Sequence, residues 1–500
     1  MIEDEVLGFV IGESTVTKTL FISKQIPRLG QYVIMEYDGK TVLGLIQGLV
    51  RGSIALPDDI HDASQVEKIK LLEHGSTQYI KGVIQILGDV YTRNIPRIPP
   101  PPGTEVRKAS KEVLKIVFGN KDSGIRIGSL ISEPDVPVYI DVNKMVTRHL
   151  AILAITGAGK SNTVAVITDE LLRLGGTVVI FDMHSEYISA RFTNGDVNKI
   201  AAKINPYNMS ISELLRLLNI EKRAFIQERY FRRAYKDVLE KISSGESVEK
   251  FLDLLISVLS GYLSSDQNKR DRDSIAGVIN KVEDFKERYG DMLDYTVPPV
   301  IEQIKPGYAN VIDLGRYDEE TADVIVSHSL RMILKERKNY VKTGKGLSFP
   351  IFLVLEEAHI LAPKDRPTLS KYWVGRIARE GRKFGVGLCI VSQRPKNLDP
   401  NTLSQANNMI VLRLVEPSDQ KYVQQASETL SEDLLQQLSS LNIGEAVVLG
   451  LMVNVPALVK IDKFKGELSV EELNVVKEWR KIHEESMKRI RELDDLTEGW

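Results

Sequence analysis

A Gly-rich turn between a predicted strand and a predicted helix, in the stretch 149–172, has the composition that phosphate binding requires. A short apolar run ends just before the turn, and a helical pattern starts at Thr163. Glycines allow backbone N–H groups to curl around phosphate oxygens, and a helix N-terminus attracts negative charge. Lys160 would reach the β- and γ-phosphates, and the Ser161 hydroxyl would ligate Mg²⁺. The expected nucleotide contacts are Gly157, Ala158, Gly159, Lys160, Ser161 and Asn162.

One position of this turn departs from the full phosphate-loop pattern G-x-x-x-x-G-K-[ST], which has Gly where this chain has Ala154. The alternative interpretation is a chance Gly-Lys-Ser turn in an ordinary strand–helix connection. A strand before the turn and a helix after it favour the phosphate loop, because that loop needs both. We therefore expect ATP and Mg²⁺ to bind at this turn.

A second predicted strand ends in two adjacent carboxylates. The apolar run Ile351 to Leu355 is followed directly by Glu356 and Glu357. Fully apolar runs are typical of strands buried on both faces of a parallel sheet, and ligands bind at the carboxyl ends of such strands. Glu356 is placed to bind the Mg²⁺ shell, and Glu357 to orient and polarise the attacking water. The alternative is a pair of surface acids that begins a loop, and the phosphate loop upstream argues against it.

Polar residues follow two further predicted strands. Ser392 and Gln393 end one of them, where an amide is suited to sensing the γ-phosphate or the lytic water. A cap or turn is the alternative role, more plausible for Ser392 than for Gln393. Asp182, His184 and Glu186 follow the other strand and point to the same end of the sheet. We expect Asp182 or Glu186 to support the Mg²⁺ shell or the nucleotide, and a separate metal site formed by all three is the less favoured alternative.

A basic helix is predicted within residues 369–385. Arg376 and Arg379 are three residues apart and share one helical face, and Arg382 follows near the end of the helix. Arg148, just before the first strand of the sheet, is a further candidate for reaching a neighbouring active site. Such arginines can act as an arginine finger in a neighbour's site or can contact DNA phosphates. A solvated basic face is the ordinary alternative.

The bulk composition indicates a multidomain globular protein. The chain has 500 residues, which exceeds one ordinary core, so two or three domains are expected. An apolar fraction of 43% and a charged fraction of 27% are ordinary for soluble proteins, and the net charge of −2 neither suggests nor excludes nucleic acid. The single cysteine favours a reducing, cytoplasmic setting. No apolar stretch approaches the about 20 residues of a membrane span, and no secretion signal is visible, so we expect no membrane association.

The distribution of turns, prolines and apolar runs predicts the domain organisation. Residues 1–93 alternate short β-type runs with turns and predict a small antiparallel β-barrel, and four consecutive prolines mark a stiff linker at 94–103. An α/β domain is expected over 104–204 and 301–468, interrupted by a helical insertion at 205–300. An amphipathic helix and tail follow at 469–500, and the terminal Trp500 could dock on a neighbouring subunit. The strand candidates of the α/β domain are HLAILAI, GTVVIFDMH, ANVIDLG, FPIFLVLEEAH, GVGLCIVSQRP, NMIVLRLV and GEAVVLGLMVNVPALVKI.

After the predicted barrel of about ninety residues, five motifs follow in order: TGAGKSN, IFDMHSEY, VLEEAH, REGRKFG and VSQRP. Taken in this order, they resemble those of the HerA family of hexameric archaeal DNA translocases, within the wider FtsK–HerA motor superfamily. The run SQRPKNLDPNTLSQANNMIVLRL is also similar to the sensor-strand region of that superfamily. The resemblance covers nearly the whole chain, and motifs in a fixed order are more specific than a phosphate loop alone.

The resemblance implies a RecA-like P-loop ATPase domain with a helical insertion, after a barrel like that of ATP synthase subunits. It implies a homo-hexameric ring that moves double-stranded DNA as an ATP-driven translocase or helicase. It also implies a partner nuclease, NurA, and a role with the end-resection and recombination machinery in DNA double-strand-break repair. The roles carried over by motif fall on Lys160 and Ser161 (phosphates and Mg²⁺), Glu356 and Glu357 (Walker B pair), Gln393 (sensor) and Arg379 or Arg382 (finger acting in trans).

Three alternative functions share part of these features. One is a conjugation- or secretion-type motor ATPase, which would need a partner to anchor it at a membrane. Another is a nucleotide-gated ring scaffold that activates a nuclease without translocation, although a pure binding module has no need of Glu357 and Gln393. The third is a protein-unfolding ring, for which an aromatic-glycine pore loop is expected, and Tyr289-Gly290 and Gly307-Tyr308 are not placed convincingly.

Overall fold

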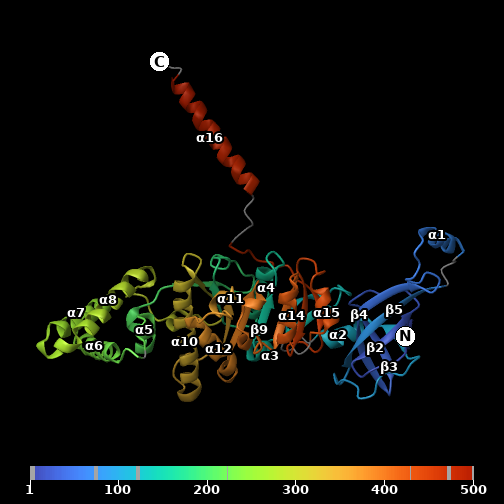
Figure 1. Cartoon of the computed structure of the whole chain (residues 1–500), viewed down its shortest axis with the longest axis horizontal. Coiled ribbons are helices and arrows are strands. Elements are labelled where there is room, and N and C mark those ends of the chain that lie inside the picture. Colours follow the sequence, from blue (N-terminus) through green and yellow to red (C-terminus); the bar gives the residue numbers. More distant parts are fainter. Residues whose placement is uncertain are drawn as a thin grey trace.

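The computed structural model describes residues 6–72, 77–119, 124–221, 223–427, 430–469 and 475–497. Figure 1 shows a β-barrel at one end of the molecule, an α/β domain in the middle and a bundle of helices at the other end. The predicted fold class, an α/β P-loop domain with a helical insertion after an antiparallel barrel, is confirmed.

The barrel closes through six antiparallel strands in the order β1-β2-β5-β4-β3-β6. Alternate side chains point inward and form a small core of its own, with Phe21, Val33 and Ile84 fully buried. One helix, α1 (Ala63–Leu72), lies between β4 and β5 and has no counterpart in the sequence prediction. The strands are β1 (Val6–Ile11), β2 (Lys18–Ser23), β3 (Tyr32–Tyr37), β4 (Lys40–Ser53), β5 (Gln78–Asp89) and β6 (Glu105–Lys108).

The barrel extends beyond the boundary that the sequence predicts at residue 93. Strand β6 follows the proline segment and pairs with both β1 and β3, so the barrel is closed only when this strand is included. The proline segment is therefore not a plain spacer between domains. Its end is bonded to the barrel, because Gly103 N–H donates to Val10 O at 2.8 Å and Val10 N–H donates to Thr104 O at 2.9 Å.

The α/β domain contains an 11-stranded sheet in the order β11-β12-β10-β13-β14-β9-β15-β16-β17-β7-β8. The strands from β11 to β15 in this order are parallel, and those from β15 to β8 are antiparallel. Every predicted strand candidate is confirmed, and the last one forms a hairpin of two strands. The strands are β7 (Gly124–Leu130), β8 (Pro137–Asp141), β9 (Leu150–Leu153), β10 (Val178–Asp182), β11 (Val197–Ile200), β12 (Ala309–Asp313), β13 (Ile351–Leu355), β14 (Val386–Ser392), β15 (Asn408–Leu412), β16 (Glu445–Gly450) and β17 (Ala457–Ile461).

The central strands are buried on both faces, as their apolar sequences require. Every residue of β9, β10, β13, β14 and β15 is buried, including the cysteine Cys389, so helices and loops cover both sides of the sheet. The helices of this domain are α2 (Lys111–Phe118), α3 (Val142–Arg148), α4 (Lys160–Arg173), α9 (Val300–Gln303), α10 (Glu319–Thr343), α11 (Ala358–Leu361), α12 (Leu369–Glu380), α13 (Pro400–Leu403), α14 (Pro417–Ala426) and α15 (Glu432–Gln437).

The predicted helical insertion is confirmed as a bundle between β11 and β12. Its helices are α5 (Ile211–Leu217), α6 (Phe225–Ser243), α7 (Phe251–Ser264) and α8 (Arg272–Arg288). One carboxylate, Glu213 in the first turn of α5, joins the bundle to α10. Its oxygens lie 3.2 Å from His328 Nδ1 and 2.8 Å from an Arg331 guanidinium nitrogen, and they accept hydrogen bonds from Ser210 N and Oγ.

The C-terminal region contains one further helix, α16 (Val475–Thr497), which stands away from the rest of the molecule in Figure 1. Trp500, with its expected docking role, lies outside the described residues. Within the described part of the chain, no helix combines the length and the apolar character that crossing a membrane demands.

Candidate active site

The phosphate loop connects β9 to α4 at the carboxyl end of the parallel strands. Gly157 and Gly159 have φ angles of 76° and 103°, which residues with a Cβ rarely adopt, so both glycines are needed for the loop's path. Lys160 is the first residue of α4, and Ser161 follows in its first turn. Ala154 is fully buried at the start of the loop, where its N–H donates to Ser392 O at 3.2 Å. The Ala154 side chain therefore packs in the core at the position where the full pattern has glycine.

Asn162, expected among the nucleotide contacts, is occupied by another part of the chain. Its side-chain amide donates to Asp462 O at 2.9 Å and its Oδ1 accepts from Phe464 N at 2.8 Å. These two bonds fasten the segment that follows β17 to the first turn of α4. The side chain of Asn162 thus binds backbone, and only its own N–H remains available to the phosphate loop.

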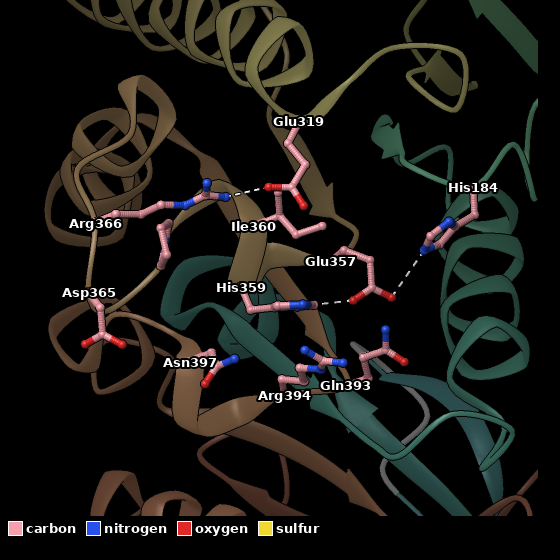
Figure 2. A pocket seen from close by; sticks show the side chains of 11 residues that line it. His184, Glu319, Glu357, His359, Ile360, Asp365, Arg366, Gln393, Arg394 and Asn397 are labelled. Carbon is pink, nitrogen blue, oxygen red and sulfur yellow. Dashed lines mark hydrogen bonds and ion pairs between the residues drawn. The ribbon is translucent and has the colours of Figure 1, made fainter.

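Glu357 lies at the centre of the candidate site, and a lysine and two histidines surround its carboxylate. Lys160 Nζ lies 2.5 Å from Oε1. His184 Nε2 lies 3.5 Å from Oε1, and His359 Nδ1 lies 3.2 Å from Oε2 (Figure 2). Glu357 has a φ of 43°, a left-handed conformation that is strained for a residue with a side chain. The strained backbone places the carboxylate beside the phosphate loop.

The electrostatics of Glu357 favour the ionised form. Burial alone raises the pKa of a carboxyl group, but the histidine contacts and the charge of Lys160 outweigh it. The pKa of Glu357 is held well below its ordinary value, and the contact with Glu357 in turn raises the pKa of His184. Glu357 is therefore a carboxylate at neutral pH, which is the state that can accept a proton or orient water.

Glu356, the other member of the pair, points into the protein. Tyr187 donates its hydroxyl to Glu356 Oε1 at 2.9 Å, and Oε2 is buried with no hydrogen-bond partner among the described residues. Burial raises the pKa of Glu356 to about 8, although the charge of Lys160 opposes this. A nearby cation would favour the carboxylate form and would satisfy the unpartnered oxygen.

Asp182 organises the turn after β10. It is fully buried, its Oδ1 accepts from Glu186 N at 3.0 Å and its Oδ2 accepts from Tyr187 N at 2.8 Å. Burial raises its pKa. Asp182 thereby positions Tyr187 beneath Glu356 and His184 beside Glu357. Within the described ranges, no group of three His, Cys, Asp or Glu side chains is arranged to hold a metal ion, so the structure does not assemble such a site from Asp182, His184 and Glu186.

Gln393 lies where the sequence places it, at the end of β14 beside the phosphate loop. Its Oε1 accepts from Thr156 Oγ1 at 2.5 Å, so a loop residue and the predicted sensor are directly linked. An open cavity of about 480 Å³ begins here and extends past Glu357 (Figure 2). The side chains that line it are His184, Glu319, Glu357, His359, Ile360, Pro363, Asp365, Arg366, Gln393, Arg394 and Asn397.

The three candidate arginines lie at the opposite end of the sheet. Arg148 ends α3 just before β9, and Arg379 and Arg382 come just before β14, whereas the phosphate loop and Gln393 follow these strands. Strand β14 has seven residues, so about 20 Å separates its two ends. Buried His149 holds the arginine-bearing segments together, because its ring bonds Ala378 O at 3.0 Å and Leu388 N at 3.1 Å.

Sequence reasoning missed several contacts of this site. His359 contacts Glu357, and Thr156 donates a hydrogen bond to Gln393. Tyr187 donates a hydrogen bond to Glu356. Tyr187 and His359 stand within the quoted motifs IFDMHSEY and VLEEAH, so the signal was present, but only the fold shows which atoms meet. His184, which belongs to the less favoured metal-site alternative, lies against Glu357.

Family models match the chain along most of its length. The HAS barrel domain matches residues 7–92, the central domain of the helicase HerA matches residues 125–333, and a HerA-like helicase C-terminal model matches residues 346–470. A DNA double-strand break repair helicase HerA of Saccharolobus solfataricus is 44% identical, with 96% of each chain covered. The chain belongs to the HerA helicase family.

Other HerA-family relatives extend this result. A DNA double-strand break repair helicase HerA of Sulfurisphaera tokodaii is 45% identical over 96% of this chain and 97% of its own. A probable helicase, MJ1565, of Methanocaldococcus jannaschii is 42% identical over 100% of this chain and 98% of its own. Family and phosphate loop together make the chain an ATPase of the helicase class. The solved structure of VirB4 of Thermoanaerobacter pseudethanolicus covers 69% of this chain and 97% of its own, with a TM-score of 0.51 and 16% identity, and supports the P-loop ATPase fold alone.

Proposed function

We propose that this HerA-family ATPase forms a hexameric ring that moves along duplex DNA and acts in the cytoplasm with the NurA nuclease in resecting double-strand breaks. The names of its relatives as break-repair helicases support a DNA substrate. The observation that carries the proposal is the arrangement of the site. Lys160, Glu357 and Gln393 meet at one end of the sheet, while the candidate arginines lie at the other end.

Hydrolysis in this proposal transfers the γ-phosphoryl group to water by positioning and charge stabilisation. Lys160 leaves Glu357 and binds the β- and γ-phosphate oxygens, since a triphosphate carries more negative charge than one carboxylate. The freed Glu357 carboxylate orients the attacking water and accepts its proton. Gln393, already bonded to the phosphate loop through Thr156, is placed to bind the γ-phosphate or that water.

The residues present fit a magnesium ion. Hard cations prefer oxygen ligands, and the buried Glu356 Oε2 lacks a hydrogen-bond partner in the described structure. Ser161 and Glu356 would hold Mg²⁺, with Asp182 fixing the turn behind them. The ion would neutralise charge that develops on the phosphate oxygens.

An arginine from the next subunit would complete each site. Arg379 and Arg382 lie about 20 Å from their own phosphate loop, judged by the length of β14, and Arg148 lies before the shorter strand β9, also away from the loop that follows this strand. The side chains of Arg379 and Arg382 are exposed, and neither has an ion-pair partner among the described residues. A guanidinium that reaches the neighbour's γ-phosphate would make hydrolysis depend on ring assembly.

Subunit mixing tests this proposal. Glu357→Gln and one of Arg148→Ala, Arg379→Ala or Arg382→Ala are each purified, shown to be inactive alone, and reassembled in equal amounts. If the arginine is the true finger, about a quarter of the sites in the mixed rings pair an intact Glu357 with an intact neighbouring arginine. The mixture should then recover about a quarter of the wild-type rate. Arg173→Ala, at the far end of α4, is the control and stays active. Failure of all three arginine variants to complement Glu357→Gln would contradict the trans-acting site.

Movement on duplex DNA is tested separately. The assembled protein is expected to displace a third strand from a triplex site in an ATP-dependent manner, without preference for sequence and with decreasing efficiency at high salt, because contacts to the phosphate backbone are screened. ATP hydrolysis without displacement would favour the alternative of a nucleotide-gated scaffold.

A further inference from the structure

His359 touches Glu357 on the side away from the phosphate loop. Its Nδ1 lies 3.2 Å from Glu357 Oε2 and 3.3 Å from Ser392 Oγ. The hydrogen bond of this nitrogen is with Ser392, and Glu357 Oε2 is buried with no hydrogen-bond partner among the described residues. A buried carboxylate oxygen without a donor is costly, and the donor that could satisfy it is already within reach.

The two oxygens of Glu357 differ in their surroundings. Oε1 contacts Lys160 Nζ at 2.5 Å and His184 Nε2 at 3.5 Å, and the ion-pair partner of Oε2 in the described part of the chain is His359. The His184 side chain is 53% exposed, whereas the His359 side chain is 12% exposed and rests against the fully buried Ser392. Of the two histidines, His359 is the one that the fold holds in place.

We propose that His359 is the positioning residue of Glu357, a step that rests on the proposed role of Glu357 in hydrolysis. When phosphates draw Lys160 away from Oε1, His359, in the tautomer with the proton on Nδ1, donates this N–H to Glu357 Oε2 in place of Ser392 Oγ. This bond fixes the carboxylate after its lysine partner has left. Oε1 is then free to accept a proton from the attacking water, while Oε2 remains bonded.

Ser392 gives this arrangement a second consequence. It ends β14 directly before Gln393, and its Oγ accepts from Arg394 N at 3.1 Å. The proposed exchange therefore links Glu357 to the strand that carries the predicted sensor. Release of Ser392 by His359 would accompany the departure of Lys160 from Glu357.

The test compares ATP hydrolysis and ATP binding in matched variants. His359→Leu removes the donor, and we expect kcat to fall about 10- to 100-fold, with the dissociation constant for ATP within about 3-fold of wild type. His359→Asn places an amide N–H near the position of Nδ1 and should restore kcat to within about 5-fold of wild type. Ser392→Ala removes the hydroxyl that holds the His359 ring beside Glu357 before Lys160 leaves, so we expect kcat to fall by about 3- to 10-fold. His61→Leu, an exposed barrel histidine, is the control and should match wild type.

Several results would overturn the proposal. A kcat of His359→Leu within 2-fold of wild type, or failure of Asn to restore activity lost in Leu, removes the positioning role. A larger loss for His184→Asn than for His359→Leu would assign the role to the other histidine. If His359→Leu fails to bind ATP, the proposal is judged from His359→Asn and Ser392→Ala. An unchanged kcat in Ser392→Ala then refutes the exchange of the His359 hydrogen bond between Ser392 and Glu357. Glu357→Gln, measured alongside, separates the two proposals, since its activity would refute the role of Glu357 itself.

Discussion

Replacing Glu213 by Gln should loosen the helical insertion from the ATPase domain. The Glu213 carboxylate contacts Ser210, His328 and Arg331, and its side chain is 15% exposed. Gln keeps the size of the side chain and an oxygen that can accept from Ser210 N. The change therefore removes the charge that pairs α5 with α10 and leaves the cap of α5 in place.

The size of the effect follows from the pKa of Glu213. Burial raises it, but the contacts with His328, Arg331 and Ser210 outweigh burial and lower it from 4.5 to about 2. This difference corresponds to about 3 kcal/mol of stability. Because the pKa is lowered in the folded state, the contribution is complete above pH 4.5 and is lost as the pH falls towards 2. At pH 7 we expect Glu213→Gln to cost about 2 to 3 kcal/mol.

Hydrogen exchange measures this cost where it acts. A loss of 2 to 3 kcal/mol should speed exchange of the α5 amides about 30- to 150-fold at pH 7, with little change in β13 and β14. Glu228→Gln is the matched control, because the Glu228–Arg232 pair is more exposed, with side chains 27% and 48% exposed, and should contribute less than about 1 kcal/mol. Equal exchange of α5 in the wild type and in Glu213→Gln would refute the reasoning.

Three further predictions concern the barrel, the C-terminal segment and the phosphate loop. A fragment of residues 1–110 should unfold cooperatively, whereas a fragment of residues 1–103 lacks β6, leaves β1 and β3 as open edges and should aggregate. If light scattering and circular dichroism show the same behaviour for both fragments, the role of β6 is contradicted. Asn162→Ala removes two hydrogen bonds that together contribute about 2 kcal/mol, and amide hydrogen exchange at residues 462–464 should become about 30-fold faster. Unchanged exchange there would show that other contacts hold the segment. Gly159→Ala puts a Cβ at a φ of 103° and should weaken ATP binding at least about 10-fold, which titration with a fluorescent analogue checks against Gly175→Ala, on the turn after α4.

The strands of the sheet, and the polar residues that gather at its edge, can be predicted from the sequence because both depend on local signals. Apolar runs such as Ile351–Leu355 are strands since only a sheet covered on both faces buries them, and polar residues that end such runs must meet at one edge. The glycines of the phosphate loop and Lys160 were read from spacing alone. These features need no knowledge of distant contacts.

The rest depends on contacts between distant segments. Strand β6 has the sequence EVRK, which is too short and too polar to predict a strand, and it forms because β1 and β3 need a partner. The left-handed backbone of Glu357 and the approach of His359 follow from the turn at the end of β13. Asn162 binds residues 462–464, which lie about three hundred residues away in the sequence.

The most direct test of the central claim is steady-state ATP hydrolysis by the purified protein with and without blunt duplex DNA, beside Glu357→Gln. The site described here predicts strong stimulation by DNA and a loss of about 100-fold or more in Glu357→Gln, with ATP binding retained. A hydrolysis rate that Glu357→Gln leaves unchanged would contradict the assigned chemistry. A rate that requires Glu357 but ignores DNA would contradict the DNA-driven motor.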